Sequence, residues 1–165
     1  MKNKSAYFQT VFEANKDKIY RLCLGFMGNS FDADDLYQEV LIKIWDNLDN
    51  FRSESAISTW IYRITTNTAI YYSKQKSRAQ KKETNAFPSQ FAQPELKEQT
   101  QENEAKIKAL YAAIATLKEI DRIIIGLVLE GTPYEMIAEI TGLKVSNVGV
   151  RINRIKKALN KKLVK

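Results

Sequence analysis

The chain has 165 residues, enough for one ordinary domain or two small ones, and its 44% hydrophobic content allows a buried core. Its formal net charge of +7 favours polyanionic partners such as nucleic acid. Histidine is absent and Cys23 is the single cysteine, which excludes zinc sites built from Cys and His, an internal disulfide and most hydrolase chemistry. We therefore expect no enzyme activity, no cofactor and no metal.

Helix-forming residues dominate the composition. The chain has only 6 glycines and 3 prolines, and Ala, Leu, Ile, Lys, Glu and Gln are plentiful, which indicates an all-α fold. The amino-terminal residues lack the apolar segment of a signal peptide, and no apolar run reaches the roughly 18 to 20 residues of a transmembrane helix. We expect a cytoplasmic protein without membrane insertion.

The positive charge is concentrated in two segments. Residues 55–82 carry six basic side chains and no acidic one, and residues 140–165 carry eight and none. Between them, residues 83–105 contain two of the three prolines and many Gln and Glu, as is typical of a linker. The sequence therefore predicts two small helical domains, residues 1–82 and 106–165, joined by a flexible linker.

Apolar residues spaced by three and four predict a helix over residues 5–27, which ends at Gly25 and Gly28, and a second helix over residues 34–48. The apolar stripe of the first helix is Tyr7, Phe8, Val11, Phe12, Ile19, Leu22 and Phe26, and that of the second is Leu36, Val40, Leu41, Ile44, Trp45 and Leu48.

The second predicted helix is acidic at its start and along its polar face. Asp35, Gln38 and Glu39 share this face. The acids are either helix caps, because the helix dipole favours negative charge there, or part of a docking surface for another protein. Both interpretations remain open from spacing alone.

The third predicted helix, residues 58–82, interleaves aromatic and basic residues. Trp60, Ile61, Ile64 and Ala69 can face the core, which leaves an outward set of Tyr62, Arg63, Thr66, Asn67, Tyr71, Lys74 and Lys76. Rings and cations on one surface suit unpaired bases and phosphates. Alternatively, the tyrosines cover the edge of the core. The polar loop before this helix, residues 49–58, is able to form a pocket for one extruded base.

The last third of the chain has the spacing of a helix-turn-helix motif. Apolar helices are predicted over residues 106–116 and 117–130, followed by short and long helices over residues 134–141 and 145–162. The short helix opens with Thr132 as N-cap and Pro133 at its first position. The spacing that points to the motif is Ala138 at the helix crossing, Gly142 in the turn and Val148 in the second helix.

The final helix has an inward stripe of Val145, Val148, Ile152, Ile155 and Leu159. Its outward side chains are Ser146, Asn147, Val150, Asn153, Arg154 and Lys157, with Arg151 on the flank. Asn and Arg read base edges in a major groove and Lys binds phosphates, so this face favours DNA binding. Gly149 is unusual inside a helix and would permit close approach of the DNA backbone.

Three blocks of sequence resemble the extracytoplasmic-function (ECF) subfamily of the sigma-70 family of bacterial RNA polymerase sigma factors. DADDLYQEVLIKIWDNLDNF, residues 32–51, is similar to the family's regions 2.1 to 2.2. FRSESAISTWIYRITTNTAIYYSKQKSR, residues 51–78, is similar to regions 2.3 and 2.4, and LEGTPYEMIAEITGLKVSNVGVRINRIKKAL, residues 129–159, to region 4.2.

The resemblance implies an alternative sigma factor that binds core RNA polymerase, directs it to specific promoters and melts the -10 element. It implies docking on the clamp helices of the largest polymerase subunit through Asp35, Gln38 and Glu39. With the outward residues above, the expected -10 contacts are Phe51, Arg52, Ser53, Trp60, Tyr62, Arg63, Asn67, Tyr71 and Lys74. The expected -35 contacts are Asn147, Val150, Arg151, Asn153, Arg154 and Lys157. The further expected partners are promoter DNA and an anti-sigma factor, with no small-molecule substrate, and the protein is expected to be a monomer outside the holoenzyme.

Several residues depart from the family pattern. Lys144 stands where the family often has Ser, Gly149 and Val150 replace Lys-Ser, Thr66 replaces a basic residue and Tyr71 replaces Asp. The promoter sequence therefore does not follow from better-matched relatives. Two other functions were weighed: a free-standing helix-turn-helix repressor or activator, which would need a dimer, and a helical protein-binding module without DNA contact.

Overall fold

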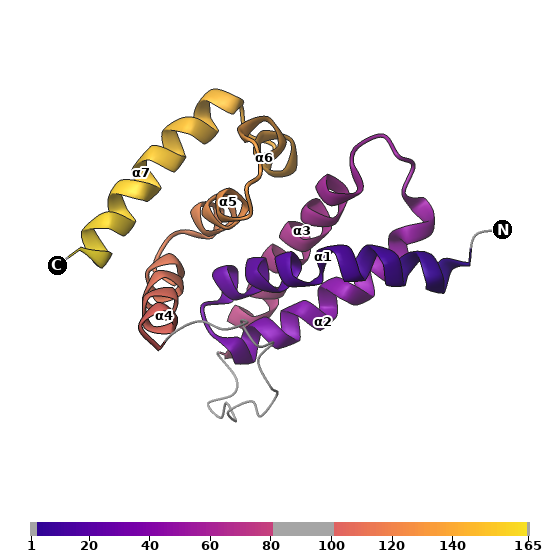
Figure 1. Cartoon of the computed structure of the whole chain (residues 1–165), viewed down its shortest axis with the longest axis horizontal. Coiled ribbons are helices and arrows are strands. Elements are labelled where there is room, and N and C mark those ends of the chain that lie inside the picture. Colours follow the sequence, from indigo (N-terminus) through magenta and orange to yellow (C-terminus); the bar gives the residue numbers. More distant parts are fainter. Residues whose placement is uncertain (1–2, 81–100, 165) are drawn as a thin grey trace.

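The computed structural model describes residues 3–80 and 101–164. These residues form helices and connecting turns and contain no strand, which confirms the all-α prediction (Figure 1). The elements are α1 Lys4–Met27, α2 Ser30–Asn47, the short 3-10 helix η1 Leu48–Asn50, α3 Ile57–Gln80, α4 Gln101–Ala115, α5 Glu119–Leu129, α6 Tyr134–Thr141 and α7 Val145–Leu163. None of the described helices combines the length and apolarity needed to cross a membrane.

The turn between α1 and α2 is set by two adjacent residues. Gly28 adopts a left-handed conformation with φ of 84° and donates its N–H to the Leu24 carbonyl, which ends α1 as predicted. Asn29 then caps α2 by accepting a hydrogen bond from the N–H of Asp32. α2 therefore begins at Ser30, four residues before the predicted start, because the cap is Asn29 and the acids already lie inside the helix.

The predicted linker is shorter at its carboxyl-terminal end than expected. α4 begins at Gln101, five residues before the predicted start, and Glu102 and Glu104 lie in its first turn, where they complement the helix dipole. Residues read as linker from their Gln and Glu content thus form the start of a helix. The remainder, residues 83–100, lies outside the described residues.

The helix-turn-helix arises at the predicted place. Gly142 ends α6 in a left-handed conformation with φ of 78°, and α7 begins three residues later. Two details differ from prediction. Pro133 occupies the N-cap position of α6, so Thr132 is not the cap and is buried instead. Val145 is exposed because it is the first residue of α7, while the rest of the predicted stripe is buried.

The first three helices form a bundle in which α2 packs on both α1 and α3. Most of the predicted apolar stripes are buried or partly buried. Tyr7 and Trp45 are exceptions, since both are exposed near the end of the helix pair. The Trp45 ring still packs edge-on against Phe8 at 5.3 Å, and the Lys4 ammonium lies 4.5 Å from its centroid.

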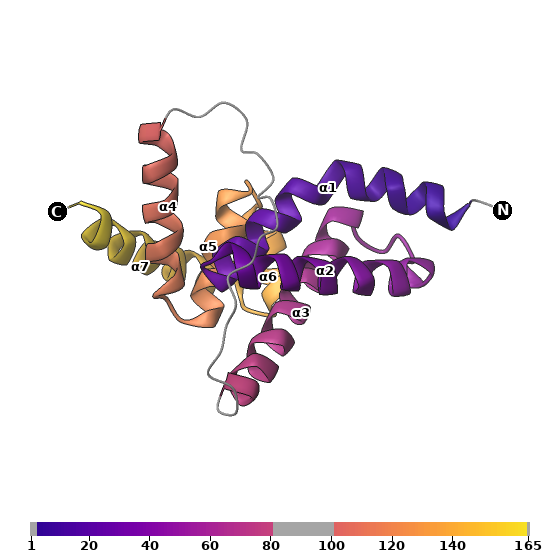
Figure 2. The same ribbon diagram turned by 90° about the horizontal axis from the view of Figure 1, so that it is seen from below.

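The amino-terminal helices α1–α3 and the carboxyl-terminal helices α4–α7 pack against each other (Figures 1 and 2). α1 contacts α5 and α4, and α3 contacts α6. One cluster of buried apolar side chains continues through both sets of helices. The two sets of helices predicted from the sequence are therefore joined in a common core.

Candidate nucleic-acid interface

The exposed face of α7 carries the residues that the sequence predicted for the -35 element. Val148, Ile152, Ile155 and Leu159 are buried beneath it. The opposite side exposes Asn147, Val150, Asn153, Arg154 and Lys157. Val150 is 52% exposed although it is apolar. The described part of α7 contains no acidic residue, so this face is both positive and able to form hydrogen bonds with base edges.

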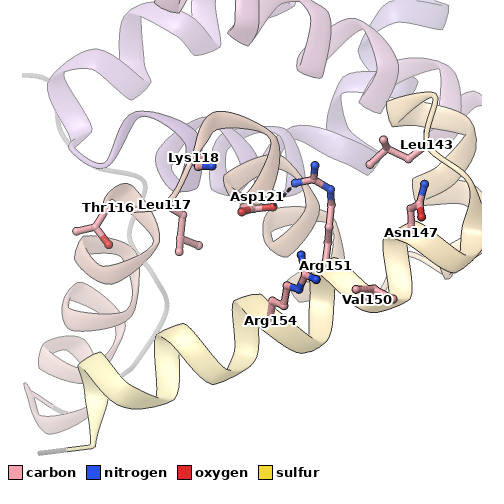
Figure 3. A pocket seen from close by; sticks show the side chains of 9 residues that line it. All are labelled: Thr116, Leu117, Lys118, Asp121, Leu143, Asn147, Val150, Arg151 and Arg154. Atoms are coloured by element: carbon pink, nitrogen blue, oxygen red, sulfur yellow. Dashed lines mark hydrogen bonds and ion pairs between the residues drawn. The ribbon is translucent and has the colours of Figure 1, made fainter.

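A pocket of about 730 Å³ lies beside this face, between α7 and the turn that joins α4 to α5 (Figure 3). Four of the six predicted -35 residues line it. Its lining residues are Asn147, Val150, Arg151 and Arg154 of α7 with Thr116, Leu117, Lys118, Asp121 and Leu143. The α7 face is therefore one wall of a concave surface with three cationic side chains, whereas the sequence predicted only a single exposed helix face.

Arg151 is held by a partner that sequence reasoning did not find. Its Nη1 donates to Oδ1 of Asp121 at 3.0 Å, and Figure 3 shows the side chain directed from α7 toward α5. The ion pair thus fixes the position of α7 on α5. Asp121 is 30 residues away in the chain, and no local pattern marks the two residues as a pair.

Gly149 lies next to an aromatic ring of α6. A β-carbon added at this glycine would have Cε2 of Tyr134, at 3.9 Å, as its nearest neighbour, which is an ordinary contact. Tyr134 itself is exposed. The fold of the chain therefore does not require glycine at this position.

The loop before α3 is anchored by two aromatic residues. The rings of Phe51 and Trp60 lie 5.2 Å apart, centroid to centroid, and both side chains are partly buried. Arg52 and Ser53 are exposed between them and the start of α3. Ser53 has φ of 59°, a left-handed conformation that is strained for a residue with a β-carbon. Strain of this kind is concentrated at functional sites, and it falls in the loop predicted to hold an extruded base.

The predicted nucleic-acid face of α3 is only partly exposed. Asn67, Tyr71 and Lys74 lie on the surface, and Tyr71, at 60% exposure, accepts a hydrogen bond from the Gln75 side chain. The prediction that Tyr62 points outward is wrong, since it is 3% exposed. Thr66, also predicted outward, is buried as well. The side chain of Lys76 lies outside the described residues.

Packing of the carboxyl-terminal helices explains why this face is covered. Thr66 lines a small cavity with Arg122 and Ile123 of α5. Burial, followed by the charge of Glu130, raises the pKa of Tyr62. Arg63 is partly buried, and its Nη2 donates to the carbonyl and the Oε1 of Glu139 at 3.3 and 3.4 Å. The face that periodicity assigns to solvent is therefore an interface with α5 and α6.

The acidic α2 surface, which we define as Asp35, Gln38 and Glu39, is exposed as predicted. Ile42, one turn further along α2, is 52% exposed and was not included among the predicted residues. An apolar residue on an otherwise polar helix face is the signal that sequence reasoning could have used.

One residue of the acidic α2 surface contacts α3. The hydroxyl of Tyr72 donates to Oδ2 of Asp35 at 3.4 Å. Burial and the nearby carboxylates raise the pKa of Tyr72 to about 12. The phenol is therefore protonated at neutral pH and able to donate this bond.

Comparisons with known proteins match both sets of helices. The family model for Sigma-70 region 2 matches residues 11–79, and the model for Sigma-70 region 4 matches residues 107–159. The ECF RNA polymerase sigma factor SigW of Bacillus subtilis is 30% identical over 174 residues, covering 94% of this chain and 88% of SigW. The ECF RNA polymerase sigma-E factor of Escherichia coli is 35% identical over 81% of this chain and 75% of its own length.

A solved structure supports the arrangement of the helices. The sigma factor RpoE from Bartonella quintana, in complex with the anti-sigma factor NepR, superposes with a TM-score of 0.73 at 22% identity. The match covers 94% of this chain and 96% of that one. The similarity therefore extends through both the α1–α3 and the α4–α7 helices.

Proposed function

Because the chain belongs to the ECF sigma factors of the sigma-70 family, which direct RNA polymerase to promoters, we propose that its two sets of helices divide promoter recognition between them. Residues 1–82 act as region 2, which binds core polymerase and opens the -10 element. Residues 106–165 act as region 4, which binds the -35 element. The observation that carries this proposal is the exposed, acid-free face of α7 at the wall of a cationic pocket.

In region 4, α7 enters the major groove of the -35 element. Asn147, Asn153 and Arg154 read base edges, Val150 contacts a thymine methyl group, and Lys157 binds phosphate. Arg151 acts mainly through its ion pair with Asp121, which fixes α7 on α5. Arg151 is therefore a positioning residue in this proposal.

In region 2, the loop from Phe51 to Ser58 and the exposed part of α3 bind the unpaired non-template strand. Tyr71 offers an exposed ring for stacking, and Asn67 and Lys74 contact base and phosphate. Phe51 and Trp60 support the loop through their ring contact, while Arg52 and Ser53 lie exposed at its surface. Arg63 joins this surface when its contact with Glu139 is broken.

The acidic α2 surface docks on the clamp helices of the largest polymerase subunit. Asp35, Gln38 and Glu39 supply charge and hydrogen bonds, and Ile42 supplies an apolar contact beside them. Polymerase performs the chemistry, so the chain acts without catalysis, cofactor or metal of its own. It works in the cytoplasm and is monomeric outside the holoenzyme. RpoE was solved with an anti-sigma factor, and we extend to this chain regulation by such a partner.

The test is reconstitution with core RNA polymerase. The purified chain and the core enzyme are combined, separated by gel filtration and used for run-off transcription on host genomic DNA. A complex that initiates at defined sites is expected, and it yields the promoter sequence directly. DNA binding by the chain alone, without a polymerase complex, would favour a repressor or activator. A module that does not contact DNA would show no promoter affinity, whereas about six phosphate contacts lower DNA affinity roughly a thousandfold between 50 and 200 mM salt.

A further inference from the structure

We propose that the polymerase-free chain closes on itself, so that α5 and α6 cover part of the nucleic-acid face of α3 while α7 remains open. The closed state follows from contacts within the chain. Its consequence for DNA rests on the proposed function of α3 and α7. The elements that meet are α1 with α5 and α4, and α3 with α6.

A two-pronged ion pair is the strongest polar contact between the two sets of helices. Nε and Nη2 of Arg21 donate to Oε1 and Oε2 of Glu130 at 2.6 and 2.8 Å. The Glu130 side chain is 6% exposed, and Arg21 is partly exposed. The hydrogen bond to Glu130 raises the pKa of Arg21. Removing either partner would leave the other charge poorly paired at the interface, so the pair acts as a latch.

Two further glutamates of α5 and α6 contact α3. The Ser73 hydroxyl donates to Oε1 of Glu119 at 2.9 Å. Arg63 donates to the carbonyl and the carboxylate of Glu139. A carboxylate offers Arg the same kind of charged acceptor as a phosphate does. Glu139 therefore occupies the cation that would otherwise be free to bind the nucleic-acid backbone.

Small residues allow the two sets of helices to approach closely. A β-carbon at Gly126 of α5 would lie 3.2 Å from Cδ2 of Leu22, and one at Gly28 would lie 2.6 Å from the β-carbon of Ala115. The interface is thus fitted at the level of single methyl groups. This fit distinguishes it from a loose contact between tethered domains.

The same interface contains a feature that favours opening. The guanidinium of Arg122 lies 4.8 Å from the Phe26 ring centroid, and its Nε is buried with no hydrogen-bond partner among the described residues. A buried donor without a partner lowers the stability of the state that buries it. The closed state is therefore held by the Arg21–Glu130 latch against this cost.

Closure affects the two nucleic-acid surfaces differently. α7 packs on α4, α5 and α6, and Figure 1 places it on the side of α5 that faces away from α3. Its exposed face is unaffected by closure. On α3, by contrast, Tyr62, Arg63 and Thr66 are covered or engaged. The closed chain is therefore able to bind a -35 duplex but is impaired in binding the -10 single strand.

The closed state is tested by measuring one distance in the free chain. Spin labels are attached at Lys18→Cys on α1 and Asn160→Cys on α7, both exposed positions, and the distance between them is measured by pulsed electron paramagnetic resonance. Cys23 is left in place because it is fully buried, and burial raises the pKa of its thiol, so it resists labelling. Arg21→Glu, Glu130→Arg and the charge-exchanged double variant are compared in this background.

A single narrow distance distribution is expected for the parent chain, and longer, broader distributions for each single variant. The double variant should return to the narrow distribution because the ion pair is restored with its charges exchanged. Lys16→Glu, which breaks the exposed pair with Glu13, is the matched control and should change nothing. A broad distribution in the parent chain, or unchanged distances in both single variants, would overturn the closed state. Circular dichroism verifies that the helices remain folded.

The consequence for DNA is measured on the same variants without labels. The probes are the -35 duplex and the -10 non-template strand of a promoter identified by run-off transcription. If the open state is about a tenth populated or less, Arg21→Glu should raise affinity for the single strand by about tenfold or more and leave duplex affinity unchanged. Longer distances without a gain in single-strand affinity would overturn the covering of α3. Failure of the parent chain in run-off transcription would instead refute the proposed function, and the label distances would still decide closure.

Discussion

The carboxyl-terminal helix α7 and the amino-terminal helix α3 both carry predicted nucleic-acid surfaces, yet only one has the surface that its sequence pattern indicates. α7 rests on its neighbours through a single apolar stripe, so its polar face is free. α3 contacts α2 on one side and α6 on another. Periodicity identifies the apolar side of a helix, but it does not show whether another part of the chain also covers the polar side.

The largest expected effect is on polymerase binding and concerns the acidic α2 surface. Glu39→Lys places a positive charge at the centre of this surface, where the proposed partner contact requires an acceptor. We expect loss of association with core polymerase, measured by co-purification, without loss of helicity.

Asp17→Lys on α1 provides the matched control, because it makes the same charge change at an exposed position outside the acidic α2 surface. This variant should co-purify with polymerase as the parent chain does. Normal association of the Glu39→Lys variant would show that the polymerase contact lies elsewhere.

The two tyrosines of α3 distinguish a buried residue from an exposed one on the same helix. Tyr62→Ala should lower the free energy of unfolding by about 3–5 kcal/mol, as is typical when a large buried aromatic side chain is removed. Tyr71→Ala should change it by less than about 0.5 kcal/mol, because the side chain is exposed, but should reduce promoter opening. Denaturant titration and permanganate footprinting measure the two effects. Equal stabilities of the variants would contradict the assignment of Tyr62 to the interface.

The fold was largely predictable because the signals that define it are local. The left-handed glycines Gly28 and Gly142 and the apolar stripe of α7 all lie within a few residues of the structure they determine. The boundaries that were wrong involve caps with competing candidates, such as Asn29 for α2 and Pro133 for α6.

The candidate site was predictable only where it lies on one helix. The exposed face of α7 follows from spacing, but the Arg151–Asp121 pair joins residues 30 apart and the Arg21–Glu130 pair joins residues 109 apart. Neither pair has a sequence signature, since any exposed acid could have been the partner. The burial of Tyr62 depends on the same long-range packing.

Two arginines of α7 separate reading of DNA from positioning of the helix. Arg154 is exposed and has no ion pair among the contacts resolved in the described residues, so Arg154→Ala should weaken promoter binding by about 1–3 kcal/mol with little change in melting temperature. Arg151→Ala should lower the melting temperature as well, because it removes the partner of Asp121. Fluorescence anisotropy with a -35 duplex and thermal unfolding separate the two outcomes. An unchanged footprint for the Arg154 variant would refute its role as a base reader.

The smallest expected effect concerns Gly149, the residue of α7 that its helical setting least explains. Gly149→Ala should raise the free energy of unfolding by roughly 0.5–1 kcal/mol, because alanine loses less backbone entropy in a helix and its β-carbon meets only the Tyr134 ring at 3.9 Å. If DNA approaches the helix backbone here, the same variant should bind the -35 duplex more weakly despite its greater stability. Opposite signs of the two effects would assign the glycine to DNA contact. A stabilised variant with unchanged affinity would show that the groove leaves room for a methyl group and that the glycine serves neither folding nor recognition.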